Sequence, residues 1–242
     1  SNWKEGYGYT VATEMYSAGI DRLTHQPLSF SVSETTEGVH IHIIDAELMG
    51  KGEKEKKDLY IEGVQNNGII NHYEYIINSE GTIEIRHVLK PEGKMPLWFP
   101  RIGLTLTVSD ALDQVKWYGR GPQENYPDRK TGYPMGIYAS TVQAMYEPYL
   151  MPQDYGLRTD VRWLQLTTDK GIGLQFKMNE WFNFNIYPYS TDNLTKAMYT
   201  YQLQKQKGMT LNLDYATTGV GCTARGVFGA YKAMPQEYRR TI

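Results

Sequence analysis

Hydrophobic and polar residues alternate with a period of two along most of the chain. Val39, Ile41 and Ile43, for example, alternate with His40 and His42. The same pattern recurs at Tyr73, Tyr75 and Ile77, at Ile83 and Ile85, at Leu104, Leu106 and Val108, at Phe182, Phe184 and Ile186, and at Leu211 and Leu213. Because successive side chains of a strand point to opposite faces, this pattern predicts strands that bury one face and expose the other. The repetition favours an all-β fold, a large antiparallel two-sheet sandwich.

Turn formers separate several of these segments. Asn78-Ser79-Glu80-Gly81 lies between two alternating runs and predicts a hairpin turn. No segment has a convincing 3.6-residue period, so we expect no long helix. No Ser/Pro/Gly-rich linker divides the chain, and we expect one domain over residues 1–242. Ser1 and Asn2 are interpreted as a remnant of cloning or the cut end of a longer protein.

Charge and composition exclude several classes of partner. The net charge of -2 and the sequence pI near 6.2 provide no basic surface for nucleic acid. No apolar run approaches the roughly 18 residues of a membrane helix, so a soluble chain is expected, either cytoplasmic or periplasmic. The single cysteine, Cys222, excludes an internal disulfide and leaves the compartment open. The charged run from Lys51 to Asp58 is interpreted as a solvated turn.

The segment from Trp117 to Lys130 combines charged residues, aromatic residues and turn formers. Its two glycines and two prolines predict a loop rather than a helix or a regular central strand. Such a loop must be held by its side chains, through charge-assisted hydrogen bonds and aromatic packing. The residues expected to hold it are Trp117, Arg120, Glu124, Tyr126, Asp128 and Arg129.

Other candidate chemistries find little support. Glu124 and Asp128 lie among Arg120, Arg129 and Lys130, which would keep both carboxylates ionised, whereas a general acid needs a raised pKa. We therefore expect structural ion pairs there and no catalytic residue.

The sequence gives equally little support for a metal site or a nucleotide-binding site. All five histidines lie at or before His87, without the local spacing of a zinc site. His40 and His42 could bind a metal from one strand face, but an exposed face is the simpler interpretation, and no metal site is expected. Gly119-Arg120-Gly121 stops short of a dinucleotide-binding motif.

The segment from Trp117 to Lys130 resembles the signature of the C-terminal small-chain domain, domain 5, of glycoside hydrolase family 2 β-galactosidases. Further segments of the chain match that family in order. They are residues 100–104, 145–156, 162–163, 182–184, 214 and 219–221. The resemblance implies a galactose mutarotase-like supersandwich. It also implies a non-catalytic domain that completes the active-site rim and carbohydrate binding for hydrolysis of terminal β-D-galactosides.

The resemblance also implies partners and site residues. The two catalytic glutamates of the family lie in an upstream barrel domain of the same polypeptide. The family's rim aromatic falls where this chain has Arg225-Gly226, and a family histidine aligns with Tyr199, so Arg225 and Tyr199 are candidates for contact with a galactoside or oligosaccharide. No cofactor is expected in this chain, although intact family members often use Mg²⁺ and Na⁺ ions and can form oligomers.

Two other functions remain open on the sequence. A stand-alone aldose 1-epimerase of related fold would need a general acid/base pair that usually includes histidine, and the lack of histidine after His87 counts against it. A free carbohydrate-binding module would bind oligosaccharides without any other domain. The natural glycan is not specified by any of these residues.

Overall fold

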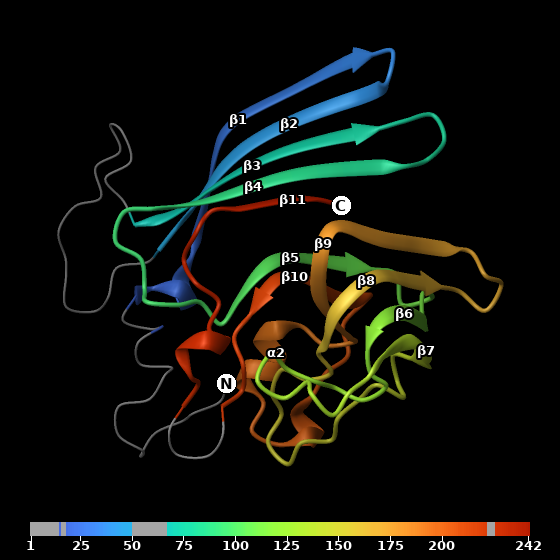
Figure 1. Ribbon diagram of the computed structural model, residues 1–242. Helices are drawn as coiled ribbons and strands as arrows, with labels where there is room; N and C mark the ends of the chain where they lie inside the picture. The colour runs from blue at the N-terminus through green and yellow to red at the C-terminus, as the bar shows by residue number, and fades with distance from the viewer. Residues whose placement is uncertain (1–14, 16–17, 50–66, 222–225) are drawn as a thin grey trace. The chain divides into compact units, whose positions relative to one another are not determined.

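The computed structural model describes Met15 and residues 18–49, 67–221 and 226–242 (Figure 1). Cys222, Arg225 and the charged run from Lys51 to Asp58 lie outside the described residues. The contacts divide the chain into two compact units. One contains Pro100–Ala233, and the other contains the described residues up to Phe99 together with Met234–Ile242. The expectation of a single domain stays a prediction.

The unit that holds the N-terminal half contains a five-stranded antiparallel sheet in the order β1-β2-β3-β4-β11. Its elements are η1 (Ile20–Arg22), β1 (Thr24–Thr35), β2 (Gly38–Leu48), β3 (Gly68–Ile77), β4 (Ile83–Glu92) and β11 (Tyr238–Thr241). Figure 1 shows β1 to β4 as long neighbouring strands, with hairpins between β1 and β2 and between β3 and β4. The predicted turn at residues 78–81 is confirmed: it joins β3 to β4, and Gly81 has a φ of 82° that suits glycine.

One-sided burial is not found throughout this sheet. Phe30, Val32 and Ile83 belong to strands whose apolar alternation is plain, yet all three are exposed. In β1, an edge strand of the sheet, nearly every residue is exposed. The period of two therefore predicted β2, β3 and β4 correctly, whereas the predicted burial of the apolar face was wrong at Ile83.

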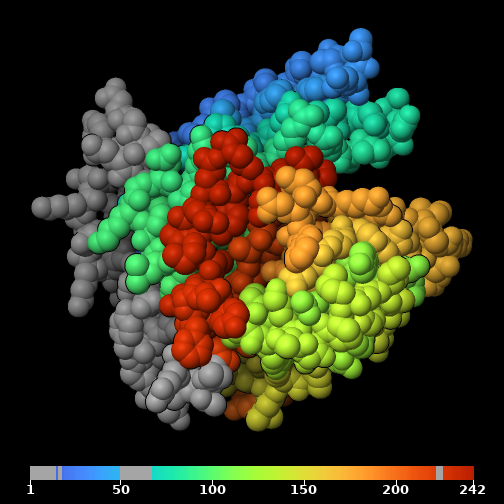
Figure 2. Space-filling view, viewed as in Figure 1, coloured from blue at the N-terminus to red at the C-terminus, as the bar shows by residue number. Residues whose placement is uncertain are grey.

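The second unit contains a six-stranded antiparallel sheet in the order β5-β10-β9-β8-β6-β7. Its strands are β5 (Arg101–Val108), β6 (Gln114–Arg120), β7 (Met135–Thr141), β8 (Arg158–Thr167), β9 (Gly173–Tyr187) and β10 (Met209–Thr217). Its helices are α2 (Thr191–Lys196), η2 (Thr200–Gln202) and η4 (Gly229–Tyr231). Figure 2 shows the β8–β9 hairpin, in yellow and orange, beside the yellow-green β6–β7 region. The all-β, antiparallel, two-sheet prediction is confirmed.

The core of the six-stranded sheet is aliphatic and aromatic. Its fully buried members include Trp117, Val161, Leu164, Phe184 and Leu211. The strand β10, which lies between β5 and β9, is buried at every position from Met209 to Tyr215. Strand β6 does alternate, with Val115 and Trp117 buried and Lys116 exposed between them.

Two local features differ from the sequence pattern. Trp181 lies in a strand-like segment, where a large aromatic side chain usually belongs to the core, but it is 58% exposed on β9. The helix α2 is only six residues long, too short to show a 3.6-residue period, and is begun by the Ser190 side chain, which accepts a hydrogen bond from the Asn193 amide. No helix in the described part of the chain combines the length and apolarity that a membrane crossing requires.

Candidate functional site

The signature segment begins as a strand, which corrects the prediction of a loop throughout. Trp117–Arg120 belong to β6, and β6 pairs with β7 on one side and β8 on the other. Both prolines come later, at Pro122 and Pro127, so no ladder hydrogen bond is lost. A side chain at Gly119 would place its Cβ 2.9 Å from Val161 Cγ2. Glycine therefore lets β6 pack closely on β8.

Glu124 is the centre of the loop that follows. Its Oε1 accepts hydrogen bonds from Arg129, at 2.9 Å, and from the Tyr149 hydroxyl. Its Oε2 accepts from the Tyr126 hydroxyl at 3.1 Å and from the Gly156 amide at 2.9 Å. The Glu124 side chain is only 7% exposed. Four donors converge on this buried carboxylate and tie the segments around residues 124–129, 149 and 156 together.

This environment keeps Glu124 ionised. Burial alone would raise its pKa, but hydrogen bonds from Tyr149, the Gly156 amide and Tyr126 outweigh burial and lower the pKa below its usual value. A general acid at neutral pH needs the opposite shift. The geometry therefore makes Glu124 a structural anion and leaves it no free oxygen for proton transfer.

Asp128 fixes a distant glycine-rich segment. Its Oδ1 accepts a hydrogen bond from the Val220 amide at 3.1 Å, and its Oδ2 accepts one from the Gly221 amide at 2.7 Å. A Cβ at Gly219 would come within 2.4 Å of the Asp128 carboxyl carbon. Only glycine at 219 allows this approach, so Asp128 sets the backbone path that leads directly to residues 222–225.

A second carboxylate, Asp160, receives the remaining cations of the signature segment. Arg120 Nε lies 2.5 Å from Oδ2, and Lys130 Nζ lies 2.8 Å from Oδ1. Asp160 adopts a φ of 56° at an irregular part of the β8–β9 pairing. Burial alone would raise its pKa, but the hydrogen bonds from Arg120 and Lys130 lower it. Arg120 thus pairs outside the signature, with a residue forty positions away.

We expect Asp160→Asn to destabilise the chain by about 1.5 to 3 kcal/mol at neutral pH, the usual size of hydrogen bonds to charged groups. Asparagine tolerates the left-handed conformation, so the change removes charge and leaves the backbone intact. Because the folded pKa lies below the ordinary 3.8, the contribution is complete above that pH and is lost as the pH falls through the folded value.

Urea unfolding of wild type and variant between pH 7 and pH 2.5 measures this effect. Asp169→Asn, at an exposed turn, is the matched control. A stability difference that stays constant over the whole range would contradict the ion-pair assignment.

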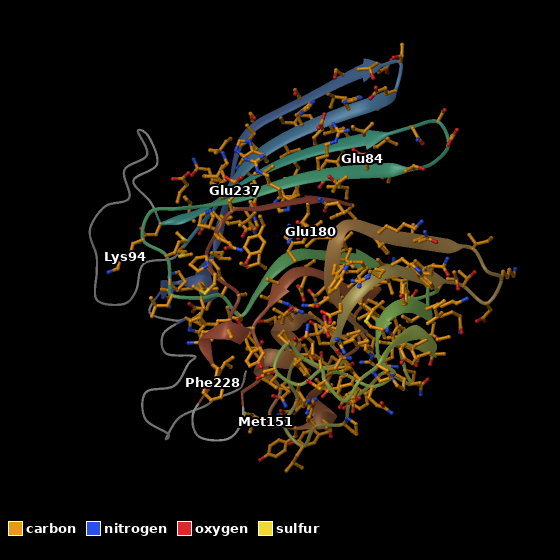
Figure 3. The ribbon with its side chains drawn as sticks, in the orientation of Figure 1. Glu84, Lys94, Met151, Glu180, Phe228 and Glu237 are labelled. Atoms are coloured by element: carbon orange, nitrogen blue, oxygen red, sulfur yellow. The ribbon has the colours of Figure 1, made fainter. Side chains whose placement is uncertain are left out.

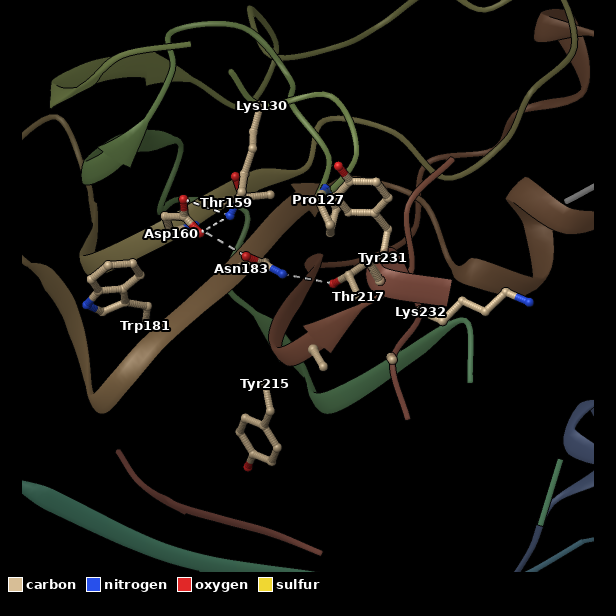
Figure 4. Close-up of a pocket in the computed structure, with 13 residues that line it drawn as sticks. Pro127, Lys130, Thr159, Asp160, Trp181, Asn183, Tyr215, Thr217, Tyr231 and Lys232 are labelled. Carbon is tan, nitrogen blue, oxygen red and sulfur yellow. Dashed lines mark hydrogen bonds and ion pairs between the residues drawn. The ribbon is translucent and has the colours of Figure 1, made fainter. Parts of the chain in front are cut away.

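A cavity of about 290 Å³ lies beside this carboxylate (Figure 4). Lys130, Asp160, Trp181, Asn183 and Tyr231 are among the residues that line it. The Asn183 side chain accepts a hydrogen bond from the Asp160 amide at 3.3 Å and donates one to Thr217 at 3.2 Å. The Arg162 guanidinium lies 3.3 Å from the centre of the Trp181 ring and covers one of its faces. The cavity therefore combines polar side chains with the exposed Trp181 ring.

A further ion pair lies between β5 and β10. Arg101 donates two hydrogen bonds to Asp214, at 3.2 and 2.7 Å, and a third to Asn185 at 3.2 Å. Burial alone would lower the pKa of Arg101, but the carboxylates of Asp214 and Asp154 outweigh it and raise the pKa. Asn212 extends this polar network to the Tyr187 hydroxyl at 3.1 Å.

Tyr199 is the described member of the two predicted substrate contacts. It is 55% exposed and its ring stacks on that of Tyr201, with centroids 5.4 Å apart and planes 7° from parallel. The Gln202 side chain accepts hydrogen bonds from the Met198 and Tyr199 amides, at 2.7 and 3.1 Å, and so fixes this turn. Arg225 lies outside the described residues, so its position relative to Tyr199 stays a prediction.

Sequence spacing could not reveal several partners. Tyr149, Gly156 and Asp160 complete the signature segment from positions 25 to 40 residues away from their partners. Tyr149 and Gly156 do lie in one of the segments by which the sequence resembles the family. That segment was the available signal, although it did not specify their contacts with Glu124.

The comparisons with known proteins decide the family. The family model described as beta galactosidase small chain matches residues 9–242. The chain belongs to the β-galactosidase small-chain family. The match covers both units, so both sheets are parts of what the family model describes.

Several similar curated proteins are named β-galactosidase. The chain is 38% identical to one from Priestia megaterium over 147 residues, which cover 61% of this chain and 14% of that protein. It is 31% identical to one from Vibrio cholerae serotype O1 over 207 residues, which cover 85% of this chain and 18% of that protein. A β-galactosidase of Pseudoalteromonas haloplanktis is 34% identical over 61% of this chain and 14% of its own length. The chain thus spans less than a fifth of these relatives.

Proposed function

We propose that this chain is the non-catalytic C-terminal domain of a family 2 β-galactosidase and completes the active-site rim for hydrolysis of terminal β-D-galactosides. The catalytic carboxyl pair is supplied by an upstream barrel domain of the same polypeptide. The main support is the relation of this chain to the β-galactosidases it resembles, of which it covers 14 to 18%. Such a fraction is the size of one domain in a multidomain enzyme.

The state of Glu124 supports a non-catalytic role. A retaining glycosidase needs two carboxyl groups about 5 to 5.5 Å apart, one of them protonated at working pH. Glu124 is buried, accepts four hydrogen bonds and has a lowered pKa. Its hydrogen bonds serve the fold of the signature segment and do not serve proton transfer.

Two exposed features support contact with carbohydrate. The stacked rings of Tyr199 and Tyr201 offer flat apolar surface, with Tyr201 79% exposed, on which sugar C–H groups can pack. Asp128 holds the backbone at Gly219–Gly221, from which the chain continues to Arg225. Arginine at that position suits a substrate that carries an acidic or strongly polar group beside its galactose unit.

We expect the 242-residue chain alone to leave a nitrophenyl β-galactoside unhydrolysed, because it lacks the barrel. In the full-length enzyme, Arg225→Ala and Tyr199→Ala should raise KM or lower kcat/KM with folding retained. Asp128→Asn should also lower kcat/KM, since it weakens the hold on the segment that leads to Arg225. Steady-state kinetics on neutral and acidic galactosides measure all three effects.

Asp192→Asn is the control, because its carboxylate pairs only with Lys196 on the exposed face of α2 in the described contacts. Hydrolysis by the isolated chain would reject the non-catalytic role, and unchanged kinetics in all three variants would reject the rim. Mutarotation of galactose by the isolated chain would support the epimerase instead. Oligosaccharide binding by the isolated chain, with unchanged kinetics in the full-length variants, would support a binding module.

A further inference from the structure

The five-stranded sheet carries a cluster of polar side chains that the proposed rim does not use. His40 and His42 are two residues apart on β2 and therefore project from the same face. The strand register pairs His42 with Glu74 on β3. The two imidazole rings are stacked, with centroids 6.4 Å apart and planes 27° from parallel.

The two histidines converge on one carboxylate oxygen. His40 Nδ1 lies 3.5 Å from Glu74 Oε1, and His42 Nε2 lies 3.8 Å from the same oxygen. The three potential ligand atoms all lie within 4.8 Å of one another. These separations are longer than those of strong hydrogen bonds. His40 Nε2 is buried and forms no hydrogen bond with the described residues.

Arg86 positions the carboxylate from the neighbouring strand. Its NH1 donates to Glu74 Oε2 at 3.0 Å, while its Nε donates to Glu84 Oε1 at 2.6 Å. Figure 3 labels Glu84 on β4. The contact with Arg86 uses Oε2 and directs Oε1 toward the imidazoles. Two carboxylates and one guanidinium leave one net negative charge when both histidines are neutral, which favours a bound cation.

We propose that His40, His42 and Glu74 form a binding site for a divalent transition-metal ion, Zn²⁺ in particular. Tetrahedral zinc with bonds of about 2.0 to 2.2 Å holds neighbouring ligand atoms about 3.4 Å apart. The two nitrogen–oxygen separations, 3.5 and 3.8 Å, are close to this distance, and the two nitrogens must move to within it of each other from at most 4.8 Å. Three protein ligands leave the fourth position to water.

The ligand chemistry selects the class of metal. Imidazole nitrogen suits zinc, copper and nickel, whereas magnesium and calcium prefer oxygen ligands. Because the ligands come from β2 and β3, a bound ion would link two neighbouring strands. It would stabilise the folded chain in proportion to its free concentration, because the unfolded chain has no preformed site.

Calorimetric titration of the EDTA-treated 242-residue chain with ZnCl2 tests the proposal. We expect one Zn²⁺ per chain, a raised unfolding temperature in its presence, and no comparable binding of MgCl2. His42→Ala and Glu74→Gln should each weaken Zn²⁺ binding by roughly 10- to 100-fold or more, at least the effect of losing an outer-shell partner. His25→Ala is the matched control, an exposed histidine 3.6 Å from Asp45 and outside the cluster.

Cobalt(II) provides an independent readout, because its visible absorption reports coordination by nitrogen and oxygen. Co²⁺ should give this absorption with wild type and His25→Ala, and lose it with His42→Ala. His42 is half-exposed, so its truncation leaves the sheet intact, as the unfolding temperature without metal will verify. Equal Zn²⁺ affinity in wild type and His42→Ala would overturn the proposal, as would loss of binding in His25→Ala alone.

Discussion

Glu124→Ala should lower the free energy of unfolding by about 2 to 6 kcal/mol, because two buried hydrogen-bond donors lose their acceptor, at a usual cost of about 1 to 3 kcal/mol each. The carboxylate is 7% exposed and accepts from Arg129, Tyr149, Tyr126 and the Gly156 amide. Its loss leaves the Tyr126 hydroxyl and the Gly156 amide buried without their acceptor. Urea unfolding measures the change as a lower midpoint with an unchanged m-value.

One further variant separates the loss of charge from the loss of side-chain volume, and another is a surface control. Glu124→Gln keeps the volume but replaces one of the two accepting oxygens with an amide NH2, so it should lose a large part of the same stability. Asp192→Ala removes an exposed partner of Lys196 and should cost at most about 0.5 kcal/mol. An unchanged midpoint for both Glu124 variants would show that the signature carboxylate is not structural and would reopen its use as a ligand or catalytic group.

The strands were predictable because their pattern is local. Alternation at β5 and at the end of β9 follows directly from neighbouring residues, and the turn at residues 78–81 follows from its own glycine. Burial was less predictable, because it depends on where a strand lies in its sheet. β1, at one edge of its sheet, is exposed at nearly every position, whereas β10, between β5 and β9, is buried at every position from Met209 to Tyr215.

The signature segment shows the same limit at the level of single residues. Its composition indicated a structure held by charged side chains, and the Glu124–Arg129 pair, five residues apart, was within reach of that reasoning. Asp128 and Arg120 instead contact groups 93 and 40 residues away. Such contacts are created by strand order, which the local sequence does not specify, so the partners of these two side chains could not be predicted.

Arg101→Met should destabilise the chain by about 3 to 5 kcal/mol at neutral pH, since it leaves Asp214 buried and without its cation. Asp214 is 2% exposed, and Arg101 contacts both of its oxygens, at 3.2 and 2.7 Å. Thr217 still donates to Asp214 at 3.3 Å, but a neutral hydroxyl does not compensate a buried charge. Chemical unfolding at pH 8 gives the size of the loss.

The pH dependence identifies the cause of that loss. Burial raises the pKa of Asp214, and the charge of Arg101 opposes the rise. Without Arg101, the rise caused by burial is opposed only by the hydrogen bond from Thr217, so the pKa of Asp214 rises further. The variant then binds a proton on folding and regains stability as the pH falls below its raised folded pKa. The deficit should therefore be smaller at pH 5 than at pH 8. Arg101→Lys keeps a cation but cannot form the bidentate contact with Asp214, so it should recover part of the stability. A deficit of equal size at both pH values would attribute the effect to lost packing rather than to an unpaired Asp214 carboxylate.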